Sequence, residues 1–172
     1  MKLDKSIFPY IPTGKMYKFV GMGNIYMQEA MNTAKELSWD TGNETSTPVG
    51  AVFVIDNKII LRTSNGSDYH KNNGCERKKL GIVGKDYELC PGCSYKVHCE
   101  AKAVNEAKKM GIDLKGSDMY MFGHFWCCKP CCDALETVGV NNYYLLENAW
   151  DLFDRNKATC RNGDWVYFKN LI

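Results

Sequence analysis

The strongest constraint on this chain is the tripeptide His98-Cys99-Glu100, together with the later sequence Cys128-Lys129-Pro130-Cys131. An imidazole and two thiolates are ligands that zinc binds in proteins, and three such ligands leave one position of a tetrahedral ion open. An open position is typical of catalytic zinc sites, where a water molecule becomes acidic near neutral pH. Glu100 adds a carboxylate that need not bind the metal and can transfer protons. The pattern therefore favours a fold that brings these segments together for hydrolytic chemistry.

Length and composition indicate an ordinary globular protein. The chain has 172 residues, of which 45% are hydrophobic and 24% charged, enough for one domain with its own core. A net charge of +2 is too small to indicate a nucleic-acid surface, so we do not expect a nucleic-acid partner. The longest apolar block near the middle of the chain, Val52 to Ile55, is far too short to span a bilayer, so no membrane association is expected.

Nine cysteines are many for a chain of this length, and their number is odd. A secreted disulfide scaffold is usually smaller and begins with a signal peptide, whereas no apolar stretch follows Met1 to Lys5 here. We therefore expect a cytoplasmic protein with reduced thiols, in which cysteines serve to bind metal.

Hydrophobic periodicity and turn residues predict alternating strands and helices. Helices are expected over 24–38, 100–110, 131–138 and 149–156. Strands are expected over 49–55, 58–63, 119–122, 142–146 and 166–168, the first two as a hairpin with Asp56-Asn57 at its turn. Residues 1–23 and 64–97 are rich in turn residues and predict loops. Alternation after residue 98 indicates parallel strands covered by helices, an α/β layer structure.

These elements place the metal-binding residue types at helix starts. His98 comes directly before one predicted helix, and Cys128 and Cys131 lie at the start of another. Residues three apart project to the same side of a helix, and the free N–H groups of a helix N-terminus favour thiolate over thiol. Two such helices on one face of a sheet would bring the three ligands together.

The H-x-E and C-x-x-C pattern resembles that of the zinc-dependent cytidine/deoxycytidylate deaminases, and most of all deoxycytidylate deaminases. The resemblance covers roughly 24–65 and 98–147, and it includes Pro48–Val52 with Asn65-Gly66, Met119–His124 and Gly139-Val140. It implies a three-layer α/β/α sandwich around a mixed sheet of about five strands. It also implies one deaminase domain over 1–172, with a Cys/His-rich insertion at about 64–97.

The resemblance further implies a reaction and a set of roles. Zinc is held by His98, Cys128 and Cys131, and the expected reaction converts dCMP to dUMP plus ammonia. Glu100 takes a proton from water and delivers protons to N3 and to the departing amine of the cytosine ring. The backbone at Cys99 is expected to hydrogen-bond the base edge, and Asn65 to hold the sugar.

Two positions depart from the family pattern. Cys127 stands where the family usually has Pro, and Cys99 where it usually has Ala. Cys127 or Cys132 could therefore replace a predicted ligand, although only 128 and 131 combine C-x-x-C spacing with the right distance to Gly139. A closed structural zinc site, with Cys127 or Cys132 as fourth ligand, is the alternative, and it leaves Glu100 without a function.

A second cluster lies in the insertion, where four residues can complete a closed zinc tetrahedron: His70, Cys75, Cys90 and Cys93. A Gly- and charge-rich loop buries little apolar area, so a metal would supply folding energy. Some deoxycytidylate deaminases are similar in having a second zinc in this insertion. A redox Cys90/Cys93 pair and free thiols are the alternatives.

Substrate contacts and partners are less constrained. His124 and Trp126 follow a predicted strand, and each either lines the pocket or packs in the core. The expected partner is a small-molecule nucleotide, and family members usually assemble, so a homo-oligomer is expected. Two other functions share the zinc pattern: a deaminase acting on another nucleobase or on tRNA or DNA, and a zinc-binding module without catalysis.

Overall fold

The computed structural model describes residues 17–37, 48–82 and 86–153, in which five strands form one mixed sheet. The strands are β1 (Tyr17–Val20), β2 (Gly50–Ile55), β3 (Lys58–Ser64), β4 (Asp118–Phe122) and β5 (Asn142–Leu146). Their order across the sheet is β1-β5-β4-β2-β3. β1 and β4 run parallel to β5, whereas β2 is antiparallel to both of its neighbours, β3 and β4.

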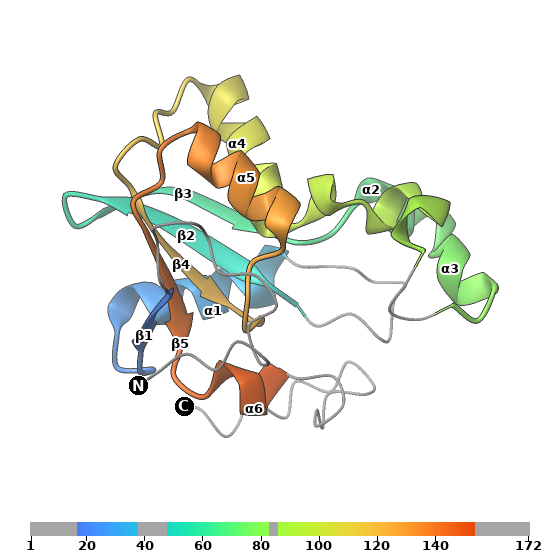
Figure 1. Cartoon of the computed structure of the whole chain (residues 1–172), viewed down its shortest axis with the longest axis horizontal. Coiled ribbons are helices and arrows are strands. Elements are labelled where there is room, and N and C mark those ends of the chain that lie inside the picture. The colour runs from blue at the N-terminus through green and yellow to red at the C-terminus, as the bar shows by residue number, and fades with distance from the viewer. Residues whose placement is uncertain (1–16, 38–47, 83–85, 154–172) are drawn as a thin grey trace.

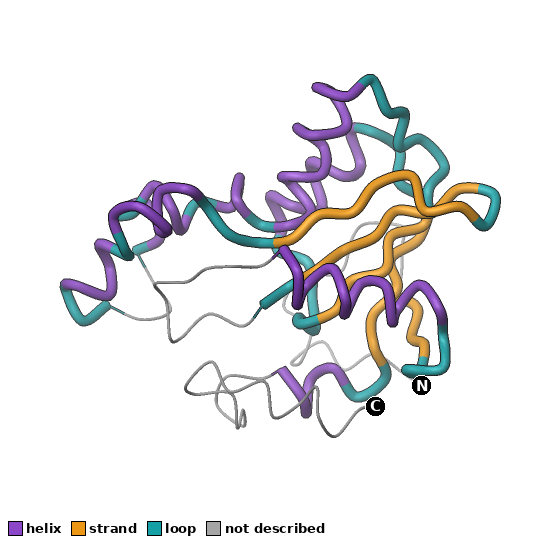
Figure 2. Tube along the Cα trace, turned by 180° about the vertical axis from the view of Figure 1, so that it is seen from behind, coloured by secondary structure: helices purple, strands orange, loops and turns teal. Residues whose placement is uncertain are grey.

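Helices cover both faces of this sheet (Figures 1 and 2). α4 (Cys99–Met110) and α5 (Lys129–Thr137) pack on one face, while α1 (Ile25–Leu37) and α6 (Ala149–Phe153) pack on the other. A hydrophobic core lies on each face of the sheet, and alternate residues of β2 pack into one or the other. Phe53 faces α4 and α5, whereas Val52 faces α1. The predicted α/β fold, with three layers and a mixed five-stranded sheet, is confirmed.

Local signals account for most element boundaries. Asp56 and Asn57 both have positive φ, 49° and 60°, which matches the twist of a two-residue hairpin turn between β2 and β3. The Oδ1 atom of Asn24 accepts hydrogen bonds from the backbone N–H groups of Tyr26 and Met27, so Asn24 caps α1 as its position predicts. α5 begins two residues earlier than predicted, because Pro130 is well tolerated in a first helical turn.

The expected loop over residues 1–23 is wrong for its last part. Tyr17–Val20 form β1, which pairs in parallel with β5 in the register Tyr17 to Tyr143. The rings of these two residues also meet edge to face, with centroids 6.4 Å apart. The predicted strand over 166–168 lies outside the described residues.

The insertion between β3 and α4 is built from short helical turns that extend to one side of the sheet (Figure 1). They are α2 (Asp68–Asn73), α3 (Glu76–Lys79) and the 3₁₀ turns η1 (Tyr87–Leu89), η2 (Pro91–Cys93) and η3 (Tyr95–Val97). Within the described parts of the chain, every helix is too short or too polar to cross a lipid bilayer.

Candidate active site

The candidate site lies where β4 ends beside the start of β2, where the register pairs Phe122 with Gly50. The chain leaves β4 through Gly123, whose φ is 96° and which lies against the carbonyl oxygen of Pro48. A Cβ atom at this position would collide with that oxygen, so the turn requires glycine. The turn leads through the His124–Trp126 loop to the N-terminus of α5.

The N-terminus of α4 is fixed to the end of β3. His98 is the N-cap residue of α4, with φ −69° and ψ 146°. The Thr63 hydroxyl donates a hydrogen bond to the Cys99 carbonyl oxygen at 2.9 Å, and Lys102 Nζ donates one to the Ser64 carbonyl oxygen at 3.3 Å. These two contacts hold the His98–Glu100 segment beside the sheet.

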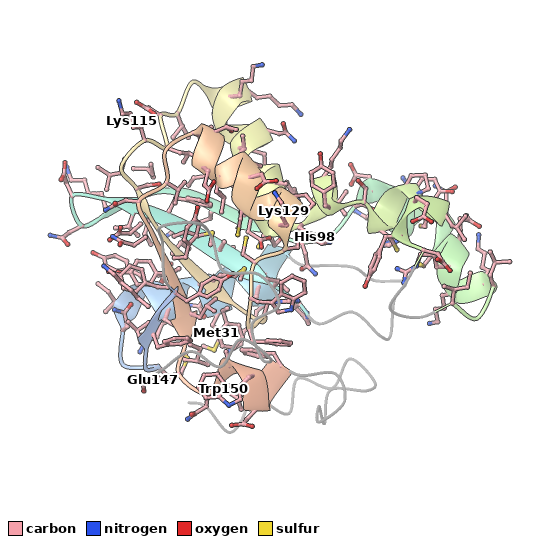
Figure 3. The ribbon with its side chains drawn as sticks, viewed as in Figure 1. Met31, His98, Lys115, Lys129, Glu147 and Trp150 are labelled. Carbon is pink, nitrogen blue, oxygen red and sulfur yellow. The ribbon has the colours of Figure 1, made fainter. Side chains whose placement is uncertain are left out.

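The N-terminus of α5 brings the predicted cysteines to His98. Cys128 is its N-cap residue and Cys131 lies in its first turn, and α4 and α5 pack side by side above the sheet (Figure 3). His98 Nδ1 lies 3.6 Å from Cys128 Sγ and 3.5 Å from Cys131 Sγ, and the two sulfur atoms are 2.7 Å apart. All three ligand atoms are near enough to share one ion.

The two thiols of this group have opposite acidities. The hydrogen bond with Cys131 lowers the pKa of Cys128 to about 6, and the contact with His98 adds to the effect. The same hydrogen bond, together with burial, raises the pKa of Cys131. Cys128 is therefore the more acidic thiol of the pair, and a metal bound there would also have to displace the proton of Cys131.

Glu100 lies in the first turn of α4 and is 5% exposed. Cys99, fully buried beside it, donates a hydrogen bond from its thiol to Glu100 Oε2 at 3.2 Å. Burial raises the pKa of Cys99 well above its ordinary value, and the negative charge of Glu100 adds to the effect, so the thiol keeps its proton. The cysteine at position 99 thus supplies a donor for the carboxylate.

Cys127 and Cys132 lie outside the His98 group. Both are fully buried in the core under α4 and α5, and their thiols contact the backbone carbonyls of Cys128 and Cys127. The Tyr17 hydroxyl accepts a hydrogen bond from the Cys127 N–H at 2.8 Å, which fixes the segment before Cys128. Sequence reasoning missed this role of Tyr17, because the contact joins residues 110 positions apart.

A pocket of about 790 Å³ opens beside the His98 group. The residues His98, Cys99, Glu100 and Cys128 line it, and so do the predicted substrate contacts Asn65, His124 and Trp126. The Asn65 side-chain carbonyl accepts a hydrogen bond from the Val49 N–H at 2.8 Å, so this amide also closes the start of β2. The His124 ring stacks on the ring of Phe125 and meets the ring of Trp126 edge to face. Its Nδ1 atom accepts a hydrogen bond from the backbone N–H of Trp126.

The insertion supplies a second wall of this pocket that the sequence did not indicate. Its lining residues are Tyr87, Glu88, Cys90, Pro91, Cys93, Ser94 and Tyr95. Aromatic rings therefore face the pocket from both sides. Three-residue 3₁₀ turns have no hydrophobic periodicity, which is why no sequence pattern pointed to this wall.

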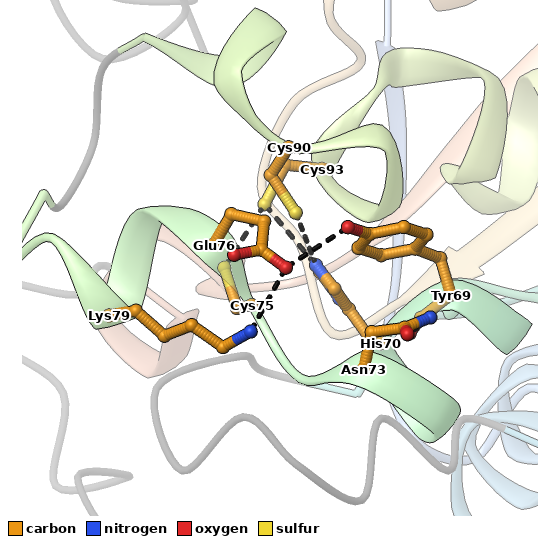
Figure 4. Close-up of polar contacts among 8 residues, drawn as sticks. All are labelled: Tyr69, His70, Asn73, Cys75, Glu76, Lys79, Cys90 and Cys93. Carbon is orange, nitrogen blue, oxygen red and sulfur yellow. Dashed lines mark hydrogen bonds and ion pairs between the residues drawn. The ribbon is translucent and has the colours of Figure 1, made fainter.

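The insertion also gathers the second predicted cluster (Figure 4). His70 Nε2 lies 3.2 Å from Cys90 Sγ and 3.5 Å from Cys93 Sγ, and Cys93 Sγ lies 3.5 Å from Cys75 Sγ. Beside them Glu76 accepts hydrogen bonds from the Tyr69 hydroxyl and Lys79 Nζ, which ties α2 to α3. Three thiols and an imidazole are the donor set of a closed structural zinc site.

The thiols of the second cluster differ in acidity as well. Burial opposes ionisation of Cys90, but hydrogen bonds from the backbone of Glu76, from His70 and from the backbone of Gly92 outweigh it and lower its pKa to about 7. Burial raises the pKa of Cys93 to about 12. All eight cysteines of the described segments are free thiols, so none of them is held in a disulfide.

A family model described as the cytidine and deoxycytidylate deaminase zinc-binding region matches residues 25–147, most of the chain. The chain belongs to this deaminase family. The matched segment contains both helix starts that carry the His98 group and the whole insertion. The predicted family is therefore confirmed, and this deaminase contains the family's zinc-binding region.

Other comparisons give weaker similarities. The dCMP deaminase from the cyanophage S-TIM5 in apo form is 17% identical, over 77% of this chain and 90% of that chain, with a TM-score of 0.45. Its structure in complex with dCMP and dUMP is 21% identical over 73% and 82% of the two chains, also with a TM-score of 0.45. A structure from a study of A-to-I editing by tRNA:A34 deaminases is 20% identical, over 69% and 76%, with a TM-score of 0.40. A search of curated proteins finds no significant match. At these values the similarities do not indicate a substrate for this deaminase.

Proposed function

We propose that the protein deaminates a cytosine mononucleotide hydrolytically, converting dCMP and water to dUMP and ammonia. The observation that carries this proposal is the placement of Glu100, whose buried carboxyl group faces the same pocket as His98 and Cys128. A closed structural zinc site would give this carboxylate no function. Among the described residues, neither Cys127 nor Cys132 joins the group of ligand atoms around His98.

The residues of the group fit a zinc ion. Their donor set is one imidazole and two cysteines, one of which is already acidic, and their mutual distances suit a single ion. Zinc held there by His98, Cys128 and Cys131 would make a water molecule acidic near neutral pH. Residues of the chain would carry out the proton transfers and bind the base.

Glu100 is proposed to move the protons. Its carboxylate accepts a proton from the attacking water, passes a proton to N3 of the cytosine, and delivers another to the amine as the bond to C4 breaks. The Cys99 thiol holds Oε2 of this carboxylate in one orientation. Water supplies the oxygen that C4 gains and two protons, of which one stays on N3 of the product and the other joins the amino group, which leaves as ammonia.

The pocket is proposed to bind the base between aromatic side chains. Trp126 and Phe125 line one side, and Tyr87 and Tyr95 line the insertion side. Stacking on aromatic rings recognises a base, and a pocket of this volume matches those that enclose small ligands. The lining residues within the described ranges include no Lys or Arg and two carboxylates, Glu88 and Glu100, so a phosphate bound there would depend on neutral donors and histidine.

Ammonia release tests the proposal. Zinc-loaded protein is mixed separately with dCMP, cytidine, cytosine, guanine and tRNA, and we expect release with dCMP. Release only with tRNA would show that the substrate is a polynucleotide and not dCMP, and no release with any substrate would favour a zinc-binding module.

A variant of Glu100 tests its role in the reaction. Glu100→Ala should keep its zinc and lose nearly all turnover, and wild-type turnover in this variant would remove Glu100 from the mechanism. Glu106→Ala, on the same helix and half-exposed, is the matched control.

The remaining features belong to the same proposal. We propose one deaminase domain over 1–172, with the insertion at about 64–97 holding a second zinc through His70, Cys75, Cys90 and Cys93. Metal analysis should find two zinc ions per chain, and one would refute the second site. The free thiols suit a cytoplasmic protein. Light scattering on the purified protein tests the expected homo-oligomer.

A further inference from the structure

The second cluster and the substrate pocket share residues. Cys90 and Cys93 belong to the cluster and also line the pocket. The other two members, His70 and Cys75, are buried and do not line it. The segment from Tyr87 to Tyr95 therefore has the cluster on one side and the pocket on the other.

Apolar packing does little to hold this segment in place. Tyr87, Leu89 and Tyr95 are 41%, 48% and 42% exposed, and each helical turn of the segment contains three residues. Exposed side chains on such short turns contribute little burial energy, so the position of the wall depends on its polar contacts. The thiol contacts of Cys90 and Cys93 with His70 are prominent among these.

Gly92 shows how closely the wall lies against the cluster. A Cβ atom at this position would collide with the imidazole ring of His70 and would lie 2.7 Å from Ser67 Oγ. Ser67 Oγ in turn accepts a hydrogen bond from the His70 N–H and caps α2. The backbone of the pocket wall at Gly92 is therefore in direct contact with His70, a predicted metal ligand.

Arg77 connects the cluster to the outer part of the wall. It is 6% exposed, its side chain hydrogen-bonds Cys93, and its guanidinium lies 4.0 Å from the centre of the Tyr87 ring. A guanidinium group keeps its positive charge in proteins, so a cation lies between Cys93 and the ring of Tyr87. A divalent ion with three thiolates and one imidazole has a net negative charge, which the guanidinium offsets.

We propose that the metal site of the insertion builds one wall of the substrate pocket, and that Arg77 is the positioning residue that joins this site to Tyr87. The proposal rests on the deaminase function above and adds a specificity role for the second site. Loss of the insertion metal should weaken substrate binding and leave the chemical step intact. Zinc at the His98 group should be retained.

Cys75→Ser is the sharpest test, because Cys75 is a member of the cluster that does not line the pocket. We expect zinc content to fall from two ions per chain to one, KM to rise about tenfold, and kcat to change by less than about threefold. A fall in kcat with an unchanged KM would overturn the proposal, and so would unchanged kinetics after loss of one zinc.

Arg77→Met tests the connection even if Cys75→Ser fails to fold. Removing a partner of a metal ligand typically weakens metal affinity by about 10- to 100-fold, so this variant should release one of its two zinc ions to a chelator faster than the wild type. KM should rise about fivefold, because Tyr87 loses its cationic partner. Lys78→Met, which removes an exposed charge from the same helix, is the matched control. Behaviour identical to this control would overturn the role of Arg77.

Amide hydrogen exchange separates this proposal from the deaminase function. In Cys75→Ser we expect residues 86–97 to lose protection while α4 from Ala101 onward keeps it, whether or not any substrate is turned over. Equal protection of 86–97 with and without the insertion metal would overturn the proposal. Inactivity of the wild type with every substrate would overturn only the proposed reaction.

Discussion

The Sγ atom of Cys99 lies 3.2 Å from Oε2 of Glu100 and donates a hydrogen bond to it inside the protein. An alanine at this place would leave the carboxylate without this donor. Cys99→Ala removes the donor and lets the carboxylate turn more freely. A weak intramolecular hydrogen bond contributes about 1 kcal/mol, so kcat should fall by about fivefold with zinc content unchanged.

Cys99→Ser is the informative control for this prediction. A hydroxyl is a stronger donor than a thiol and is smaller, so kcat should stay within about twofold of the wild type. A serine variant as slow as the alanine variant would show that packing at position 99 matters and the hydrogen bond does not.

Zinc binding at the His98 group should weaken as pH falls below about 6. The pKa of Cys128 in the folded protein is lowered from 9.0 to about 6, chiefly by its hydrogen bond with Cys131. The thiolate's contribution to stability is therefore fully present above pH 9.0 and is lost as pH falls through about 6. Protons then compete with the metal for the sulfur.

Equilibrium dialysis against zinc buffers at pH 8, 7, 6 and 5 measures this effect. The Cys75→Ser background removes the insertion site from the measurement. We expect retention to fall gradually from pH 8 to 7, because binding displaces the proton of Cys131, and steeply between pH 6 and 5, where a proton on Cys128 must be displaced as well. Equal retention at pH 8 and pH 5 would contradict the assignment of Cys128 as a ligand.

Local signals predicted the parts of the fold that depend on neighbouring residues. The Asp56-Asn57 turn and the cap at Asn24 involve contacts within a few positions, and both formed as expected. The meeting of His98 with Cys128 and Cys131 was also predictable, because both segments begin helices on the same face of the sheet.

The missed features depend on contacts between distant parts of the chain. β1 pairs with β5, and its four residues carry no signal strong enough to distinguish them from the preceding loop. The pocket wall from Tyr87 to Tyr95 is placed by the cluster, and not by any periodicity of its own. Arg77 resembles its lysine neighbours in the sequence, and only the fold shows that it is buried against Tyr87.

Gly50→Ala should destabilise the protein strongly. A Cβ atom on Gly50 would collide with the backbone of α1 at the Ala30 carbonyl oxygen and the Ala34 nitrogen, and neither can move without shifting the helix. Overpacking of this kind costs about 1–3 kcal/mol or more, which thermal unfolding followed by circular dichroism will measure. Gly23→Ala, where a Cβ atom meets nothing within 4 Å, should change stability by less than about 0.5 kcal/mol. Equal melting temperatures for the two variants would contradict the close approach of β2 and α1.

Tyr17→Phe tests whether the N-terminal strand supports the active-site loop. The Tyr17 hydroxyl accepts a hydrogen bond from the Cys127 N–H at 2.8 Å in a buried position, so the variant leaves that N–H without this acceptor. The cost of an unsatisfied buried donor is about 1–3 kcal/mol, and denaturant unfolding should show a loss in this range. Because Cys127 directly precedes Cys128, the variant should also release zinc from the His98 group faster.

Tyr26→Phe removes the same hydroxyl from an exposed hydrogen bond to the Asn57 carbonyl oxygen, so it controls for the chemical change itself. Water can replace that bond, and we expect a loss below about 0.5 kcal/mol with unchanged zinc release. If Tyr17→Phe loses stability but releases zinc at the wild-type rate, β1 stabilises the sheet without positioning the metal ligands. If it does both, the contact between β1 and the loop before α5 is part of the active site's framework.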